Sequence, residues 1–245
     1  MLIRITVQAD NSLVLPLSYS LYLQAFLYHF INEERYARFL HDTGYSCRER
    51  VFKLFCYSNF VENPIWINGA GRRISYPSTV SFYVSAVEDQ FFQYCAQSML
   101  EGDSRYQIGG QSVQVTQIEA IRQEIGTRER IRALSPITVY STLTTGDGRK
   151  HTLYYAPHEK EFGRLIQQNL VHKYQAYYGR EPEDDSFSIE PERGIKERKS
   201  LYKQFVIRGY VGQFRIQGSP ELMKMAFAAG LGGKNGQGFG FILQA

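Results

Sequence analysis

The residue with the clearest capacity for chemistry in this sequence is a histidine in the first quarter of the chain. His41 lies three residues before Gly44, in a segment whose pattern predicts a short helix that begins at Asn32. A histidine titrates near neutral pH, so His41 could move a proton in acid–base catalysis without a metal ion. Its alternative role is structural, because a histidine in the last turn of a helix stabilises the helix dipole.

A second candidate is a Gly-rich segment, GLGGKNGQGFG, at residues 230–240. Glycine lets a backbone approach a ligand closely, and free backbone N–H groups beside a lysine suit phosphate binding. A P-loop does not fit, because Ala228 stands in place of its first glycine and Asn235 in place of its Ser or Thr. A structural turn is the alternative, although a turn needs only one or two glycines. The predicted phosphate-binding residues are Gly230, Gly232, Gly233, Lys234, Asn235, Gly236 and Gly238.

Basic residues gather on predicted strands in the second half of the chain. Three arginines alternate along residues 128–132, so they face one side of a strand. Residues 193–215 hold seven bases against one acid, interleaved with aromatic residues, as is typical of a nucleic-acid surface. A solvated hairpin is the alternative. The predicted nucleic-acid-binding residues of these segments are Arg128, Arg130, Arg132, Lys199, Lys203 and Arg208.

The net charge of the 245-residue chain, +4, hides an uneven distribution. Residues 181–192 hold six acids and no base, so the rest of the chain has 28 bases against 18 acids, or +10. This acidic run lacks the spacing of a calcium-binding loop and predicts a mobile loop. A hydrophobic content of 43% is typical of a globular protein and excludes disorder of the whole chain.

The sequence offers no pattern for metal, cofactor or membrane binding. The five histidines lack HxH and HExxH spacing, and the three cysteines form no CxxC pair. Dispersed cysteines in odd number indicate reduced thiols. The longest apolar-rich stretch, residues 21–31, is too short to span a bilayer, and the first residues lack the order of a signal peptide. We expect a cytoplasmic protein with no metal, no cofactor and no membrane partner.

Periodicity predicts the elements that position these residues. In the first half, strands are predicted at 2–7, 50–58, 79–87 and 111–123, and helices within 18–31, at 32–44 and at 88–100. In the second half, strands are predicted at 130–140, 151–155, 200–217 and 238–243, and helices from Pro157 and from Ser219, with a hairpin turn at 146–148. Both halves repeat the order β-α-β-β-α-β. The predicted fold is α+β, with two tandem ferredoxin-like domains at residues 1–126 and 127–245.

These residues together carry a family resemblance. The Gly-rich segment resembles the Gly-rich loop of the RAMP superfamily of CRISPR proteins. Within that superfamily, the chain resembles the CRISPR-associated endoribonuclease that cuts repeat RNA into guide RNAs, over nearly its whole length. Besides the Gly-rich segment, the similar segments are Tyr22–Tyr28, Phe39–His41, Phe52–Ser58, Leu134–Ile137 and Glu159–Phe162.

The resemblance implies a fold, a reaction and three catalytic residues. The family has two ferredoxin-like (RRM-like) domains and cleaves CRISPR repeat RNA (pre-crRNA) without metal, by attack of a ribose 2′-OH that leaves a 2′,3′-cyclic phosphate and a 5′-OH. Its catalytic histidine, tyrosine and lysine fall on His41, Tyr28 and Lys53. His41 would transfer a proton, Lys53 would stabilise charge on the phosphorane, and Tyr28 would position the substrate or donate a proton. His29 points about 100° away from Tyr28 around the helix, so we prefer His41.

Two other functions are open on the sequence. A non-catalytic RNA-binding RAMP subunit of a CRISPR effector complex would have the same fold and Gly-rich loop. A phosphate-loop nucleotide enzyme fits poorly, because the motif fails. The joint presence of Tyr28, His41 and Lys53 favours the nuclease. A homodimer and association with an effector complex are the further partners considered, and the RNA could be unstructured or a hairpin.

Overall fold

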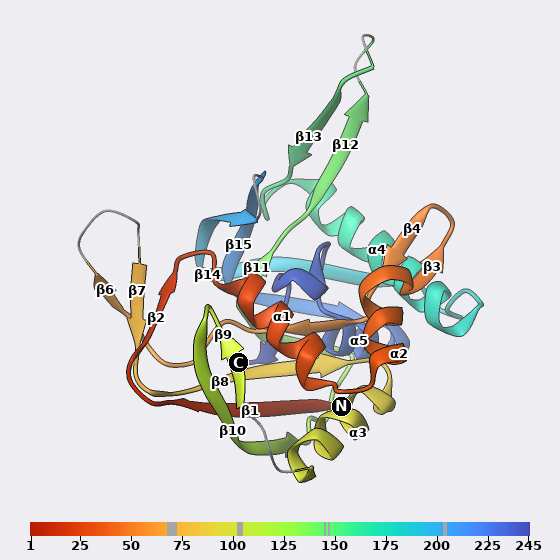
Figure 1. Cartoon of the computed structure of the whole chain (residues 1–245). Coiled ribbons are helices and arrows are strands. Elements are labelled where there is room, and N and C mark those ends of the chain that lie inside the picture. Colours follow the sequence, from red (N-terminus) through yellow and green to blue (C-terminus); the bar gives the residue numbers. More distant parts are fainter. Residues whose placement is uncertain (68–72, 102–104, 145, 147, 203–204) are drawn as a thin grey trace.

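The computed structural model describes residues 1–245 except 68–72, 102–104, 145, 147 and 203–204. Each of its two main sheets is antiparallel and is built from one half of the chain (Figure 1). The first sheet has the order β5 (Phe55–Tyr57), β8 (Thr79–Ala86), β1 (Leu2–Ala9), β10 (Gln111–Ile121) and β9 (Arg105–Ile108). The second has the order β14 (Phe187–Tyr202), β15 (Phe205–Gly218), β11 (Arg128–Ile137) and β16 (Ile242–Gln244).

Two long helices accompany each sheet and bury its apolar face. These are α1 (Ser20–Phe30) and α3 (Asp89–Leu100) in the first half, and α4 (Lys160–Tyr178) and α5 (Pro220–Ala229) in the second. Ile3, Ile5 and Val7 alternate along β1 and lie in one core with the apolar side chains of α1 and α3. In both sheets the strands of the β-α-β-β-α-β unit stand in the order second, third, first, fourth. This order confirms the predicted ferredoxin-like fold.

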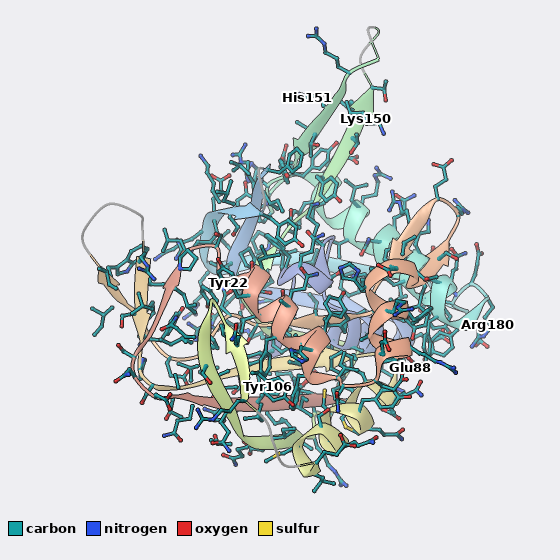
Figure 2. All side chains as sticks on the ribbon, in the orientation of Figure 1. Tyr22, Glu88, Tyr106, Lys150, His151 and Arg180 are labelled. Carbon is teal, nitrogen blue, oxygen red and sulfur yellow. The ribbon has the colours of Figure 1, made fainter. Side chains whose placement is uncertain are left out.

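Several short elements are inserted into the two units. In the first half they are β2 (Leu13–Pro16), α2 (Glu34–Arg38), the π-helical turn η1 (Phe39–Thr43), β3 (Tyr45–Cys47), β4 (Arg50–Phe52), β6 (Ile65–Ile67) and β7 (Arg73–Tyr76). In the second half they are β12 (Tyr140–Thr144), β13 (Lys150–Tyr154) and the 3-10 turn η2 (Asn235–Gln237). The β12–β13 hairpin projects from the body of the molecule and carries Lys150 and His151 (Figure 2). The turn predicted at 146–148 includes position 147, which lies outside the described residues.

The single strand predicted at residues 50–58 is wrong. The chain instead forms β4, which pairs with β3, and then β5, which joins the first sheet beside β8. Leu54, between them, has a φ of 52° and packs into the core of the second half. A backbone in this region turns sharply, which a period-two pattern does not reveal.

Three other boundaries differ from the sequence prediction. The segment 200–217, predicted as one long strand or two, belongs to the hairpin β14–β15, which begins at Phe187, so the end of the acidic run is strand rather than loop. Glu33 rather than Asn32 caps α2, because its carboxylate accepts the backbone N–H groups of Arg35 and Tyr36. The helix predicted from Pro157 begins at Lys160. Within the described part of the chain, no helix has the length and apolarity to cross a membrane.

The two halves meet through a small apolar cluster between the sheets. Leu2 and Cys56 from the first half and Phe241 from the second are buried there. The rings of Tyr83 and Phe241 stack with centroids 6.1 Å apart. The three cysteines, Cys47, Cys56 and Cys95, are free thiols.

A buried lysine ties α4 to the Gly-rich loop. Lys173 is only 1% exposed, and its Nζ donates hydrogen bonds to the carbonyl oxygens of Gly230 at 2.7 Å and Gly232 at 3.1 Å. Burial lowers the pKa of Lys173 from its ordinary 10.5 to about 7, with a smaller opposing effect of Cys56. A charge in this place is costly, because the surrounding protein solvates it less well than water.

This burial predicts a pH dependence of stability that Lys173→Met removes. Between the folded pKa of about 7 and the unfolded value of 10.5, the unfolded chain binds the proton that the folded chain has lost. The free energy of unfolding of the wild type, relative to Lys173→Met, should therefore rise between pH 7 and pH 9, by up to about 1.4 kcal/mol per pH unit. Urea unfolding of both proteins at several pH values measures this difference. The exposed variant Lys160→Met is the control, and a pH-independent difference for Lys173→Met would contradict the expectation.

Candidate functional site

A cleft of about 790 Å³ lies where α1, the β3–β4 hairpin, the start of β12 and the Gly-rich loop meet. Three of its lining residues, Tyr28, His41 and Lys53, are those predicted to be catalytic. The Gly-rich loop contributes Gly232, Gly233, Lys234, Asn235 and Gly236 to the same lining. The cleft is therefore built from both halves of the chain. Gly230 and Gly238 are not among its lining residues.

The three predicted catalytic side chains are in direct contact or share a hydrogen bond. The rings of Tyr28 and His41 meet edge to face, with centroids 5.3 Å apart. The Nζ of Lys53 donates a hydrogen bond to the backbone carbonyl of His41 at 2.7 Å. His29, the alternative histidine, is exposed and its ring instead packs against Tyr106 at 5.7 Å. His29 is not among the residues that line this cleft, in agreement with its position about 100° away from Tyr28 around the helix.

A π-helical turn presents His41 to the cleft. Residues 39–43 form this turn, and Gly44 ends it with a φ of 66°. The hydroxyl groups of Tyr36, before the turn, and Tyr45, after it, both donate to the same carboxylate oxygen of Glu88, at 2.8 Å and 2.5 Å. Figure 2 shows Glu88 on the side of the molecule where α2 and α3 lie. One carboxylate therefore holds both ends of the segment that carries His41.

Asp42 is a member of the site that the sequence analysis did not identify. Its Oδ1 lies 2.6 Å from Nδ1 of His41, and this hydrogen bond lowers the pKa of the Asp42 carboxyl. A carboxylate can only accept, so Nδ1 carries the proton and Nε2 of the neutral ring is left as the basic nitrogen. The only signal in the sequence was the adjacency of Asp42 to His41.

The protonation states of Tyr28 and Lys53 suit donation. Burial raises the pKa of Tyr28 to about 12, so its hydroxyl keeps its proton at neutral pH. Burial lowers the pKa of Lys53, and the charge of Asp42 opposes this shift. The amino group of Lys53 is therefore partly buried at the cleft and close to the carboxylate of Asp42.

The Gly-rich loop is a compact, self-braced turn. The Nδ2 of Asn235 donates to the carbonyl oxygens of Leu231 at 3.1 Å and Phe239 at 3.0 Å, so this side chain is used inside the loop. A Cβ at Gly232 would lie 2.4 Å from a backbone oxygen, that of Thr138, and the φ of Gly232 is 68°. Both observations require glycine at this position. The loop therefore has the structural role that the sequence left open, as a closely packed turn. This role is compatible with a role in binding.

Gln24 joins the loop to α1 and was missed by the sequence analysis. Its Nε2 donates to the carbonyl of Gly236 at 2.6 Å, and its Oε1 accepts from the hydroxyl of Tyr202 at 2.8 Å. Gln24 precedes Tyr28 by one helical turn, so both lie on the same face of α1. Arg50, Tyr140 and Tyr202 also line the cleft and place a cation and two aromatic rings there.

The predicted basic stripe lies apart from the cleft. Arg128, Arg130 and Arg132 are exposed on β11 but are not among the lining residues. Arg130 and Arg215 pair with Glu192 at 2.7 Å and 3.0 Å, so the acidic run neutralises part of this stripe.

The basic residues of the β14–β15 hairpin differ among themselves. Arg208 is paired with Glu197, whereas Lys199 is exposed. Lys203 lies outside the described residues. The RNA contacts of all these residues stay predictions.

Comparison with known proteins identifies the family. Residues 119–243 match the family model described as CRISPR associated protein Cas6, C-terminal. The CRISPR-associated endoribonuclease-like protein Cas6nc of Pyrococcus horikoshii is 30% identical over 164 residues, which cover 66% of this chain and 67% of that protein. The CRISPR-associated endoribonuclease Cas6 1 of Methanocaldococcus jannaschii is 26% identical over 247 residues, 99% of this chain and 92% of that protein.

Solved structures agree in fold. The product of a Cas6-related gene from Pyrococcus furiosus has a TM-score of 0.86 at 23% identity, and covers 100% of this chain and 98% of its own. A RAMP protein described as binding different RNA substrates has a TM-score of 0.84 at 24% identity, with 100% and 99% of the two chains covered. The family model matches only residues 119–243, whereas these two structures share the fold of the whole chain. The chain belongs to the Cas6 family of CRISPR-associated proteins.

Proposed function

We propose that this protein is an endoribonuclease that cleaves CRISPR repeat RNA (pre-crRNA) to guide RNAs in the cleft between its two halves. One observation carries the proposal: Tyr28, His41 and Lys53 face the same cleft as the Gly-rich loop. A histidine, a lysine and a protonated tyrosine are sufficient side chains for transesterification of RNA without metal. The endoribonuclease names of the full-length relatives support this reading.

The proposed reaction gives each of these groups one role. Nε2 of His41 accepts the proton of a ribose 2′-OH, and the freed oxygen attacks the adjacent phosphorus. The bond from phosphorus to the 5′ oxygen breaks, which leaves a 2′,3′-cyclic phosphate, and a water molecule protonates the leaving oxygen to give a 5′-OH. In this proposal the ammonium of Lys53 stabilises the negative charge that develops on the phosphorane, and the hydroxyl of Tyr28 donates a hydrogen bond to it.

The cleft suits a single strand of RNA at the point of cleavage. The cations of Arg50 and Lys234 can meet phosphates, and Tyr140 and Tyr202 offer faces on which bases stack. The Nζ of Lys234 lies 5.4 Å from the centroid of the Tyr140 ring. A base on Tyr140 and a phosphate on Lys234 would therefore be neighbours on one strand.

We further propose that residues 1–126 and 127–245 are two domains. The strands of the first main sheet end at Ile121, and those of the second begin at Arg128. A boundary near residue 126 therefore cuts through neither sheet.

Replacement of His41 should abolish cleavage and leave RNA binding intact. His41→Ala removes the proton acceptor, and we expect the single-turnover rate to fall by about 10²–10⁴-fold. His29→Ala is the matched control, because His29 belongs to the same region but packs against Tyr106. Wild-type cleavage should persist in EDTA and stop on RNA with a 2′-deoxy sugar at the scissile position. Cutting of the deoxy substrate would contradict the mechanism, and intact processing by His41→Ala would favour the non-catalytic RNA-binding subunit.

Two replacements of Lys53 should show whether its positive charge contributes to the rate of cleavage. Lys53→Met removes both the ammonium and its hydrogen bond to the carbonyl of His41, and should slow cleavage by about 10²–10³-fold. Lys53→Arg keeps the charge and should retain more activity than Lys53→Met. Single-turnover rates of the two variants on the same RNA measure the difference. Equal rates would show that charge at this position does not matter.

We propose that the chain forms a homodimer, and the exposed edge strand β6 supports this proposal. Ile65 and Trp66 are 74% and 67% exposed on this edge, where β7 is the one strand of the described residues that pairs with β6. Light scattering of the wild type should give the mass of a dimer, and Trp66→Ser should shift the mass to that of a monomer. A monomeric wild type at micromolar concentration would refute the proposal.

Association with an effector complex also stays a prediction, to be tested by co-purification of the other CRISPR proteins with the chain.

A further inference from the structure

Lys173 is a buried amine that the reaction described above does not use. It lies in the last third of α4, and its Nζ donates to Gly230 O at 2.7 Å, Gly232 O at 3.1 Å and, at the longer distance of 3.5 Å, Ala229 O. Ala229 is the last residue of α5, and the two glycines open the Gly-rich loop. These hydrogen bonds of Lys173 thus all go to one short stretch of backbone.

No ion pair explains the lysine at this position. Among the described residues, no ion pair involves Lys173, and the titratable group that opposes the lowering of its pKa is the thiol of Cys56. Burial raises the pKa of Cys56 to about 11, so this thiol is neutral at pH 7. A methionine of similar length would remove the buried amine and would leave the carbonyls of Gly230 and Gly232 without this donor.

The place of Lys173 in the molecule suggests what its amine does. It is among the residues that line the cleft, together with Gly232, Gly233 and Lys234. Carbonyl oxygens at the start of the loop would repel a phosphate if they faced the cleft, and the amine of Lys173 holds two of these oxygens by hydrogen bonds. The following residue, Gly233, is fixed from the other side, since its N–H donates to the carbonyl of Thr138 at 2.9 Å.

The rest of the loop depends on this first turn. Lys234 has a φ of 61°, in the left-handed region, and its side chain reaches Tyr140. Gly236 lies against Lys53, so that a Cβ on Gly236 would be 3.2 Å from the Cβ of Lys53. A shift of the first turn would therefore move both a phosphate-facing lysine and a neighbour of a predicted catalytic lysine.

We propose that Lys173 is a positioning residue for RNA cleavage, which fixes the first turn of the Gly-rich loop and thereby sets Lys234 and Lys53 against the scissile phosphate. This inference rests on the proposed endoribonuclease function. It deepens that function by assigning a role to a side chain that the catalytic trio does not include. The contribution is to alignment, and misplacement of a reacting group by about 1 Å can cost about 10²-fold in rate.

The test compares Lys173→Met with the wild type in two separate measurements. The dissociation constant is measured with repeat RNA that carries one 2′-deoxy sugar at the scissile position, and the single-turnover rate with all-ribose RNA at saturation. We expect the rate of Lys173→Met to fall by about 10–10²-fold, while the dissociation constant changes by less than about threefold, because many other phosphates contribute to binding. Lys160→Met, at the exposed start of α4, should equal the wild type in both.

A merely structural role would give a different pattern. It would lower the thermal midpoint, and the rate would recover at lower temperature, as expected also for the core variant Leu170→Ala. Lys173→Gln keeps a donor for the loop carbonyls and should have a rate between those of Lys173→Met and the wild type. If Lys173→Met does not fold, Lys173→Gln alone decides, with an expected loss of at least about fivefold.

The outcomes separate the two proposals. A wild type that cleaves, with Lys173→Met or Lys173→Gln at the same rate, overturns the role of Lys173 and leaves the endoribonuclease in place. A wild type that does not cleave any repeat RNA overturns the endoribonuclease itself, and with it the role of Lys173.

Discussion

Contact of backbone against backbone at the Gly-rich loop is the constraint on which the rest of the site depends. A Cβ at Gly240 would lie 2.0 Å from the carbonyl oxygen of Leu231, and the N–H groups of Gly233 and Gly240 donate to Thr138 and Pro136 at the end of β11. Side chains at these positions would force the two segments apart. Since Gln24 holds the outer side of this loop through Gly236, the distance between the two halves of the cleft follows from how closely the loop packs.

The segment from β4 to β5 connects the two halves of the chain. Lys53 faces the cleft, Leu54 packs into the core of the second half, and Cys56 lies in the cluster between the sheets. Neighbouring residues thus serve three different surfaces, which requires the left-handed backbone at Leu54. Lys53, the lysine predicted to be catalytic, lies between β4 and β5, and its neighbours Leu54 and Cys56 anchor the backbone in two apolar clusters.

The topology was predictable from the sequence. Each helix and strand of a β-α-β-β-α-β unit shows its characteristic spacing of apolar residues within one short stretch of the chain. The features that escaped prediction depend on contacts distant in sequence. Gln24 acquires its role only when Gly236, 212 residues later, comes beside it. Glu192 forms an ion pair with Arg130 because the register of β14, β15 and β11 brings the two residues together. A count of charges along the sequence does not contain this register. The sharp turn at Leu54 left no mark in an alternating pattern.

The π-helical turn that carries His41 makes the length of its segment a functional property. A π turn contains one residue more than an α turn, and each residue rotates the following side chains by about 100° around the axis. Glu33 caps the helical segment at one end and Gly44 closes it at the other. Loss of a single residue between these two points would restore a regular helix and turn His41 away from Tyr28. A variant chain could then keep every catalytic residue type and still lack the site, so in relatives of this protein the spacing between cap and glycine is as informative as the histidine.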